Sequence, residues 1–445
     1  MSESVEKSPY TARFWLAFAS NTLCSLGFIL LYWYADLVTF LGGSEFELGW
    51  IVGIGMVGSL AVRLLMGSAI DEYGTGLVWL VSLLVSVACC VAHPFLTTCH
   101  GPAIYILRVL LSAATAGVYG AMTTWMTMNS PPKRVAEMVG MLGASGFLSL
   151  IVGTYLGDYL MDVAVVSQAD IARLFLVAAA FILASAGFAW AATGISRGPD
   201  TEPRSPMRTV LRHHNPGIFL FAAVITGVGL GLPASFLKTF CDSTGIRQMA
   251  EFFTAYAAAA LTVRLCTRRL PERVGLSPLV IAGMAMMAVS QLAFLVVDTR
   301  WELIIPGILY GISHAILFPP VLAGATRVYP RSSSGLAVMI VLLFYDSGVL
   351  IGSPLAGAIV HYSKALGVPA YPALFLFMCL LFTVSTVIFA GFRYRTYRRS
   401  AVAPPHFVAL TPPVLSEPVL AESVPCVRLP ETAVPVDAPS ETQAG

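Results

Sequence analysis

The chain has 445 residues, of which 57% are hydrophobic and only 11% are charged, and its formal net charge is +2. Roughly a quarter to a third of a water-soluble surface is charged, so this composition and a mean hydropathy of +0.79 exclude an ordinary soluble protein. The charges gather in short gaps between long apolar runs, which is the pattern of a protein that crosses a membrane many times.

Twelve apolar segments follow one another along the chain, and we expect each to cross the membrane as an α-helix. An apolar run of about 20 residues spans roughly 30 Å of hydrocarbon, and a helix satisfies its backbone hydrogen bonds within the span. The first run is longer than a signal-peptide core and has no obvious cleavage site, so we interpret it as a span. The predicted spans cover residues 14–41, 46–70, 76–96, 102–128, 135–161, 171–193, 216–240, 249–267, 276–297, 303–327, 334–360 and 371–392.

The charges of the loops predict which way the spans face, because cytoplasmic loops carry an excess of Lys and Arg. With the N-terminus inside, the outer loops and their edges hold only Arg173, Lys238, Arg247, Arg300 and Lys364. We therefore expect both termini in the cytoplasm, most simply at a bacterial inner membrane. The expected organisation is a cytoplasmic N-terminus (1–13), a six-helix bundle (14–193), a basic linker (194–215), a second bundle (216–393) and a disordered proline-rich cytoplasmic tail (394–445).

A charged stretch at the end of the second span recurs about half a chain later. AVRLLMGSAIDEYG (61–74) and TVRLCTRRLPERVG (262–275) align when the numbering is shifted by 201 (264 − 63). Two such copies indicate the duplication of one structural unit. The aligned pairs are Arg63 with Arg264, Asp71 with Glu272, and Gly74 with Gly275.

These features together resemble the major facilitator superfamily over about residues 14–393. The family's loop signature after the second helix, G-x-x-x-D-R/K-x-G, is met by Gly67, Asp71 and Gly74, while Glu72 replaces the basic residue. The second copy lacks the leading glycine, and the segment after Arg108 is similar to the family's fourth-helix arginine motif. The resemblance implies a switch that holds one conformation closed at the inner ends of the helices. Its residues would be Arg63, Gly67, Asp71, Gly74, Arg264, Glu272, Arg273 and Gly275.

Four titratable side chains inside spans are candidates for proton coupling or gating, because such groups are costly in a membrane and face the bundle interior. Asp36 and Arg108 lie at a similar depth, about 8 Å below the outer boundary, and we expect them to form a pair. His314 and Asp346 lie near the middle of their spans, where a carboxylate needs a partner or a proton. The alternatives are a static ion pair or a snorkelling side chain for Asp36, a packing hydrogen bond for His314, and a fixed bond from Asp346 to backbone or to Arg63.

Aromatic residues in the spans, one pair of charged residues and the cysteines have simpler expected roles. Trp33, Tyr119, Trp125 and Tyr310 are candidates for the wall of a substrate cavity, although such side chains also serve as interface anchors. Lys238 and Asp242, four positions apart, are predicted to form a surface pair. The cysteines are interpreted as packing residues, with a Cys99–Cys241 disulfide as the alternative.

The expected protein is all-α, with two pseudo-symmetric six-helix bundles. It lacks a nucleotide-binding loop and the motifs of hydrolases or metal sites, so we expect no enzyme, no cofactor, no metal and no nucleic-acid partner. The expected function is proton-coupled movement of a small organic solute through the lipid bilayer by a monomer working by alternating access, with export ahead of import. The alternatives are a sugar or metabolite symporter, or a membrane sensor or scaffold of the same fold that has lost transport.

Overall fold

The computed structural model describes residues 10–131, 134–163, 165–194, 216–267, 270–329 and 334–402. The chain forms two compact units, Met1–Tyr397 and Arg398–Gly445. Most of the predicted linker (194–215) and of the predicted tail lies outside the described residues. The last helix nevertheless continues to Val402, beyond the predicted end of the last span at residue 392.

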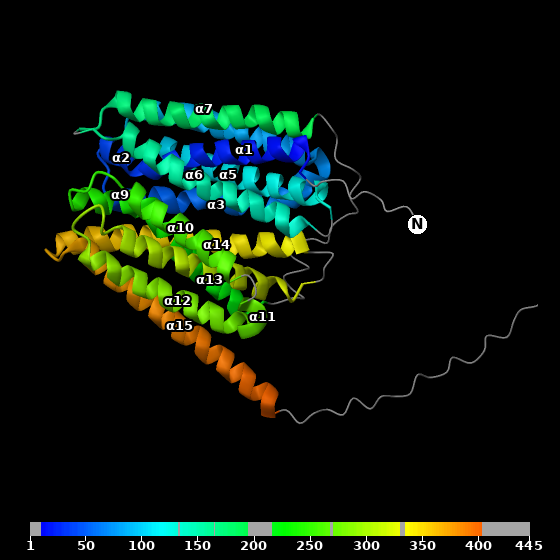
Figure 1. The fold of residues 1–445 in the computed structure, drawn as a ribbon. Helices are drawn as coiled ribbons and strands as arrows, with labels where there is room; N and C mark the ends of the chain where they lie inside the picture. The colour runs from blue at the N-terminus through cyan, green and yellow to red at the C-terminus, as the bar shows by residue number, and fades with distance from the viewer. Residues whose placement is uncertain are drawn as a thin grey trace, which may run out of the picture. The chain divides into compact units, whose positions relative to one another are not determined.

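Every regular element among the described residues is helical, and Figure 1 shows the helices of the first unit lying roughly side by side. We call the elements up to α7 the N-terminal half and those from α9 the C-terminal half. The N-terminal half contains α1 (Ala12–Leu30), η1 (Leu31–Trp33), α2 (Tyr34–Phe40), α3 (Glu45–Tyr73), α4 (Thr75–Ala92), η2 (His93–Phe95), α5 (Pro102–Asn129), α6 (Val135–Leu160) and α7 (Gln168–Thr193). The C-terminal half contains α9 (Ile218–Ser243), α10 (Ala250–Cys266), α11 (Leu270–Val274), α12 (Leu276–Ala293), η3 (Phe294–Val296), α13 (Ile304–Thr326), α14 (Ser334–Ala365) and α15 (Ala370–Val402).

Eleven of the described helices are long and apolar enough to cross a membrane. The predicted eighth span corresponds to α10, which has 17 residues and carries Glu251 and Arg264. At 1.5 Å per residue it still reaches about 26 Å, close to the thickness of the hydrocarbon layer. The all-helical fold of a multi-pass membrane protein is therefore confirmed.

Turns at both ends of the helices follow from local chemistry. Ser44 and Ser167 each begin a helix with a capping box, in which the serine and an acidic residue three positions later satisfy each other's backbone N–H groups. Gly74 and Gly275 precede α4 and α12 with φ of 80° and 89°, which glycine adopts without a steric cost. The two copies of the repeated stretch thus share one backbone turn. We call this end of the first unit the Gly74 end.

The opposite end, where α2 leads into α3 through Gly42, is called the Gly42 end. Here the two halves meet along α3 and α14. A Cβ added at Gly53 would lie 2.5 Å from the ring of Pro354, and one added at Gly357 would lie 2.4 Å from the backbone oxygen of Glu45. Small residues therefore bring the helices of the two halves into close contact.

Candidate functional site

A cavity of about 450 Å³ lies between the two halves. Its wall comes from α1, α5 and α6 in the N-terminal half and from α9, α10 and α13 in the C-terminal half. Aromatic rings dominate it, and they belong to Tyr32, Tyr119, Phe147, Phe252, Phe253, Tyr256 and Tyr310. Within the described part of the chain, the residues lining the cavity include Arg264 and His314 but no Asp or Glu.

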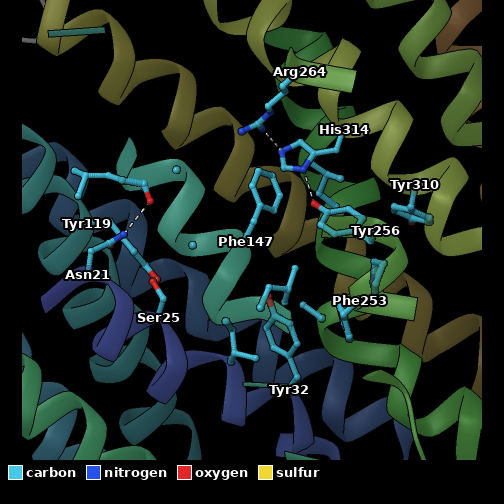
Figure 2. Close-up of a pocket in the computed structure, with 18 of the residues that line it drawn as sticks. Asn21, Ser25, Tyr32, Tyr119, Phe147, Phe253, Tyr256, Arg264, Tyr310 and His314 are labelled. Carbon is cyan, nitrogen blue, oxygen red and sulfur yellow. Dashed lines mark hydrogen bonds between the residues drawn. The ribbon is translucent and has the colours of Figure 1, made fainter. Parts of the chain in front are cut away.

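The polar groups of the C-terminal half form a connected row in the cavity wall (Figure 2). Nη2 of Arg264 lies 3.4 Å from Nε2 of His314, and Nδ1 of His314 is hydrogen-bonded to the hydroxyl of Tyr256. Arginine can only donate, so Nε2 of a neutral His314 accepts and its Nδ1–H donates to Tyr256. The guanidinium carbon of Arg264 lies 5.0 Å from the ring centre of Phe147 on α6, and its buried Nε has no hydrogen-bond partner in the part of the chain that the structure describes.

A second polar group comes from the N-terminal half, on the left in Figure 2. The side-chain amide of Asn21 donates to the backbone oxygen of Leu142 at 3.0 Å and to the hydroxyl of Ser145 at 2.6 Å. The hydroxyls of Ser25 and Tyr119 lie 3.1 Å apart. The cavity thus has a cationic wall on α10 and α13 and a neutral hydrogen-bonding wall on α1 and α5.

An ion pair joins the halves beside this cavity. Nε of Arg63 on α3 lies 2.5 Å from Oδ2 of Asp346 on α14, and both side chains are largely buried. The hydroxyl of Ser59 donates to the same carboxylate oxygen. Of the alternatives for Asp346, the bond to Arg63 is the one observed. Arg63 does not reach Asp71, because eight residues of helix separate them by about 12 Å.

The remaining members of the predicted switch lie apart from the cavity. Gly67 lies within α3, and Asp71 is exposed in its last turn. Glu272 and Arg273 are exposed on α11. Arg264 faces His314 instead of Glu272, so the predicted cluster is divided between the cavity and the Gly74 end.

The expected pair between Asp36 and Arg108 is not formed. Oδ1 of Asp36 lies 3.2 Å from Nζ of Lys238 on α9, while the guanidinium of Arg108 lies 4.6 Å from the ring centre of Tyr34. Tyr34 and Asp36 are two residues apart, so they project about 200° apart around one helix and cannot both face α5. The predicted pair of Lys238 with Asp242 is formed, and Asp242 is exposed, but Lys238 is buried and also bonds to Asp36, so the pair is not confined to the surface.

Asp158 was missed as a functional candidate by the sequence analysis. Its carboxylate, in the last turn of α6, accepts from the backbone N–H groups of Met249 (3.0 and 3.1 Å) and Ala250 (2.8 Å) at the start of α10. A carboxylate is favourable at a helix N-terminus, where N–H groups are unpaired. The available signal was an acidic residue inside a predicted span. Together with the ring contact of Tyr32 and Phe253 at 5.0 Å, it joins the halves at the Gly42 end.

The aromatic candidates divide into two groups. Tyr119 and Tyr310 line the cavity, and the hydroxyl of Tyr310 donates to the backbone of Gly229 at 2.9 Å. Trp33 and Trp125 lie in the core of the N-terminal half instead. The ring of Trp33 fills the space over Gly157, where a Cβ would come within 2.1 Å of it, and the ring of Trp125 lies 6.1 Å from that of Trp79. Cys99 and Cys241 are both free.

Comparisons with solved structures agree with this fold. The nucleoside transporter NupG superposes with a TM-score of 0.69 at 12% identity, covering 86% of this chain and 99% of that one. A bacterial homologue of the human lysosomal transporter Spinster, in an inward-facing and unoccupied conformation, gives a TM-score of 0.67 at 14% identity and covers 88% and 98%. At such identities the likeness shows the fold alone.

Sequence comparisons add the family. The uncharacterized MFS-type transporter YhhS of Escherichia coli (strain K12) is 24% identical over 164 residues, and its counterpart in Shigella flexneri matches equally. The match spans 37% of this chain and 39% of those relatives. The model of the Major Facilitator Superfamily matches residues 14–270 and 216–424, which is most of the chain. This chain is therefore an integral multi-pass membrane protein that belongs to the Major Facilitator Superfamily of transporters.

Proposed function

We propose that the protein is a proton-coupled secondary transporter, which moves a small organic solute by alternating access. The observation that carries the proposal is the position of the cavity, which is lined by three helices from each half. A site between two halves is exposed to one side and then the other when the halves rock. Among the described residues, Arg134, Arg273 and Arg327 lie at helix ends on the Gly74 side, so we infer that this end faces the cytoplasm.

The contacts at the Gly42 end would act as the outer gate. The Asp36–Lys238 ion pair and the bonds from Asp158 to the start of α10 both cross between the halves. Both are charge-assisted contacts, which form and break as units when the geometry changes. Opening this end requires that both break, and water can then solvate the released charges.

Asp346 is proposed as the proton-coupling carboxylate. It faces Ser59 and Arg63 across the boundary between the halves, and Tyr345 lies beside it on α14. A proton on the carboxylate would remove its charge and weaken the bond to Arg63, so protonation would loosen α3 from α14. Asp36 can respond in the same way through Lys238 and is the second candidate.

Distances between spin labels at both ends of the protein test the alternation without a known substrate. In a background without native cysteines, Thr39→Cys and Thr244→Cys report on the Gly42 end, while Thr127→Cys and Glu272→Cys report on the Gly74 end. All four positions are exposed. We expect the two distances to change in opposite directions when the pH is lowered. In Asp346→Asn this response should be lost or strongly reduced, whereas the exposed Asp162→Asn serves as the matched control.

Proton movement in liposomes then tests the coupling. Purified protein with a pH dye inside the vesicle should move protons when a candidate solute is added on one side. The direction of the pH change inside the vesicle distinguishes the expected exporter, an antiporter, from a symporter. Distances that stay constant at both ends over pH and over a solute panel would refute alternating access. A full response in Asp346→Asn would refute the role given to that carboxylate.

A further inference from the structure

The duplication provides two corresponding arginines whose surroundings differ. Arg63 and Arg264 are aligned in the repeated stretch, and each lies on the second span of its half. Each also reaches the fifth span of the opposite half. Arg63 meets the carboxylate of Asp346 on α14, while Arg264 meets the phenyl ring of Phe147 on α6.

The positive charge of Arg264 is therefore not neutralised by a carboxylate in the way that the charge of Arg63 is. Among the described residues, no carboxylate lies within ion-pair distance of Arg264. Its side chain contacts the imidazole of His314, which brings no negative charge, and its buried Nε has no hydrogen-bond partner among the same described residues. Arg264 is partly buried, and a guanidinium that loses part of its water is costly unless an anion and hydrogen bonds compensate for it. The open side of the Arg264 guanidinium faces the cavity.

We propose that the solute is an organic anion, whose carboxylate binds the guanidinium of Arg264 in the place that Asp346 occupies beside Arg63, while Nε2 of His314 keeps accepting from Arg264. The planar guanidinium offers several donors to a carboxylate. The surrounding rings of Phe147, Tyr256 and Tyr310 suit an aromatic or otherwise apolar body. The inference rests on the proposed function in one respect, namely that the ligand of this cavity is the transported solute.

Binding of a matched set of probes to the full-length protein in detergent tests the charge preference. The set is naphthalene-2-carboxylate, naphthalene-2-carboxamide and 2-naphthylmethylammonium, which share a ring system and differ in charge. We expect the carboxylate alone to raise the midpoint of thermal unfolding and to give heat of binding. In Arg264→Gln its affinity should fall roughly tenfold or more, since bonds to charged groups are the strong ones. The exposed Arg13→Gln removes one positive charge outside the cavity and should bind as the wild type does.

A second pair of variants keeps the arginine in place. Phe147→Glu gives α6 the carboxylate that Asp346 provides on α14, and its side chain extends about as far as the phenyl ring. It should neutralise Arg264 and abolish binding of the carboxylate probe. Phe147→Gln, which has the same shape without the charge, should lose far less affinity. Equal losses in the two variants would show that the ring, not the charge of Arg264, is what matters.

Three results would overturn the proposal: equal binding of the amide, stronger binding of the ammonium, or no binding of the carboxylate up to its solubility limit. These results are separable from a failure of transport. If the spin-label distances alternate but the anion does not bind, only the substrate class is wrong. If the anion binds in an Arg264-dependent way but the distances stay constant, the cavity is an anion site in a protein that does not alternate.

Discussion

Replacing Asp158 by Asn is expected to open the Gly42 end of the protein. The carboxylate of Asp158 receives three N–H contacts from Met249 and Ala250, which hold the end of α6 against the start of α10. Asparagine keeps one acceptor oxygen and nearly the same volume. It removes the negative charge and turns an NH₂ group toward donors that need an acceptor.

The size of the effect follows from these contacts. Hydrogen bonds to a charged group are worth about 1.5–3 kcal/mol, and a negative charge at a helix N-terminus adds about 0.3–1 kcal/mol. Asn retains part of the bonding, so we expect a loss of about 2 kcal/mol, all of it in the state whose Gly42 end is closed. A change of this size shifts the ratio of open to closed states roughly 30-fold.

The reactivity of a cavity cysteine measures this ratio. Ala234 lines the cavity from α9, and Ala234→Cys can be introduced in a background without native cysteines. A membrane-impermeant thiol reagent added at the Gly42 side should then modify it roughly 30 times faster with Asp158→Asn than without. The reaction must be followed in oriented membranes, so that access from the other side does not contribute.

Asp162→Asn is the matched control. Its carboxylate lies 3.8 Å from Arg247, and both side chains are about half exposed or more. Such pairs contribute at most about 1 kcal/mol, so the rate should change less than fivefold. Unchanged reactivity in Asp158→Asn, or the same increase in both variants, would refute the view that Asp158 keeps the outer gate closed.

Three further predictions concern the scaffold. Gly348→Ala should lower the midpoint of thermal unfolding by the equivalent of about 1–3 kcal/mol, because the new Cβ would lie 2.0 Å from the backbone oxygen of Val224; an unchanged midpoint would contradict the close contact of α9 with α14. Gly74→Ala should cost about 1–3 kcal/mol, because φ of 80° with ψ of 156° is a conformation that essentially only glycine adopts. Gly140→Ala, in a helix with open space around it, should be neutral or stabilising. In the turn before α13, the backbone N–H groups of Asp298 and Thr299 donate to the carboxylate of Glu302 and lower its pKa. These bonds are complete above the pKa that Glu302 has in the unfolded state, and they are lost as the pH falls through its lowered pKa in the folded state. Hydrogen exchange of the Asp298 and Thr299 amides, corrected for the intrinsic rate, should therefore accelerate as the pH falls through that lowered pKa.

The positions of the spans could be predicted from the sequence because a membrane helix must remain apolar for a set length. Depth along the membrane is predicted by counting residues, and in the structure Arg108 contacts Tyr34, two residues before Asp36. Rotation around the helix axis does not follow from counting. The 3-10 turn at Leu31–Trp33 interrupts the first span, and such a turn advances by 3.0 residues instead of 3.6. The predicted partner of Asp36 was therefore wrong.

The cavity could be predicted only in part, for the same reason. Tyr119 and Tyr310 face it and Trp33 and Trp125 do not, yet all four are aromatic residues inside spans. Which of them faces inward depends on packing partners such as Gly157, whose missing side chain makes room for the ring of Trp33. A single sequence does not contain these pairings, since they join residues more than a hundred positions apart.

The departures from internal symmetry are the more informative part of the duplication. In the proposed mechanism the two halves rock against each other, so parts that serve the motion can be shared, as the turns at Gly74 and Gly275 are. A solute is not symmetric, and the residues that bind it have no reason to match their counterparts. Arg63 meets a carboxylate and Arg264 meets an aromatic ring from the equivalent span. Arg264, which has no such carboxylate partner among the described residues, lines the cavity, whereas the Arg63–Asp346 pair lies outside the cavity wall. This is the distribution expected if Arg63 holds the halves together and Arg264 binds what passes between them.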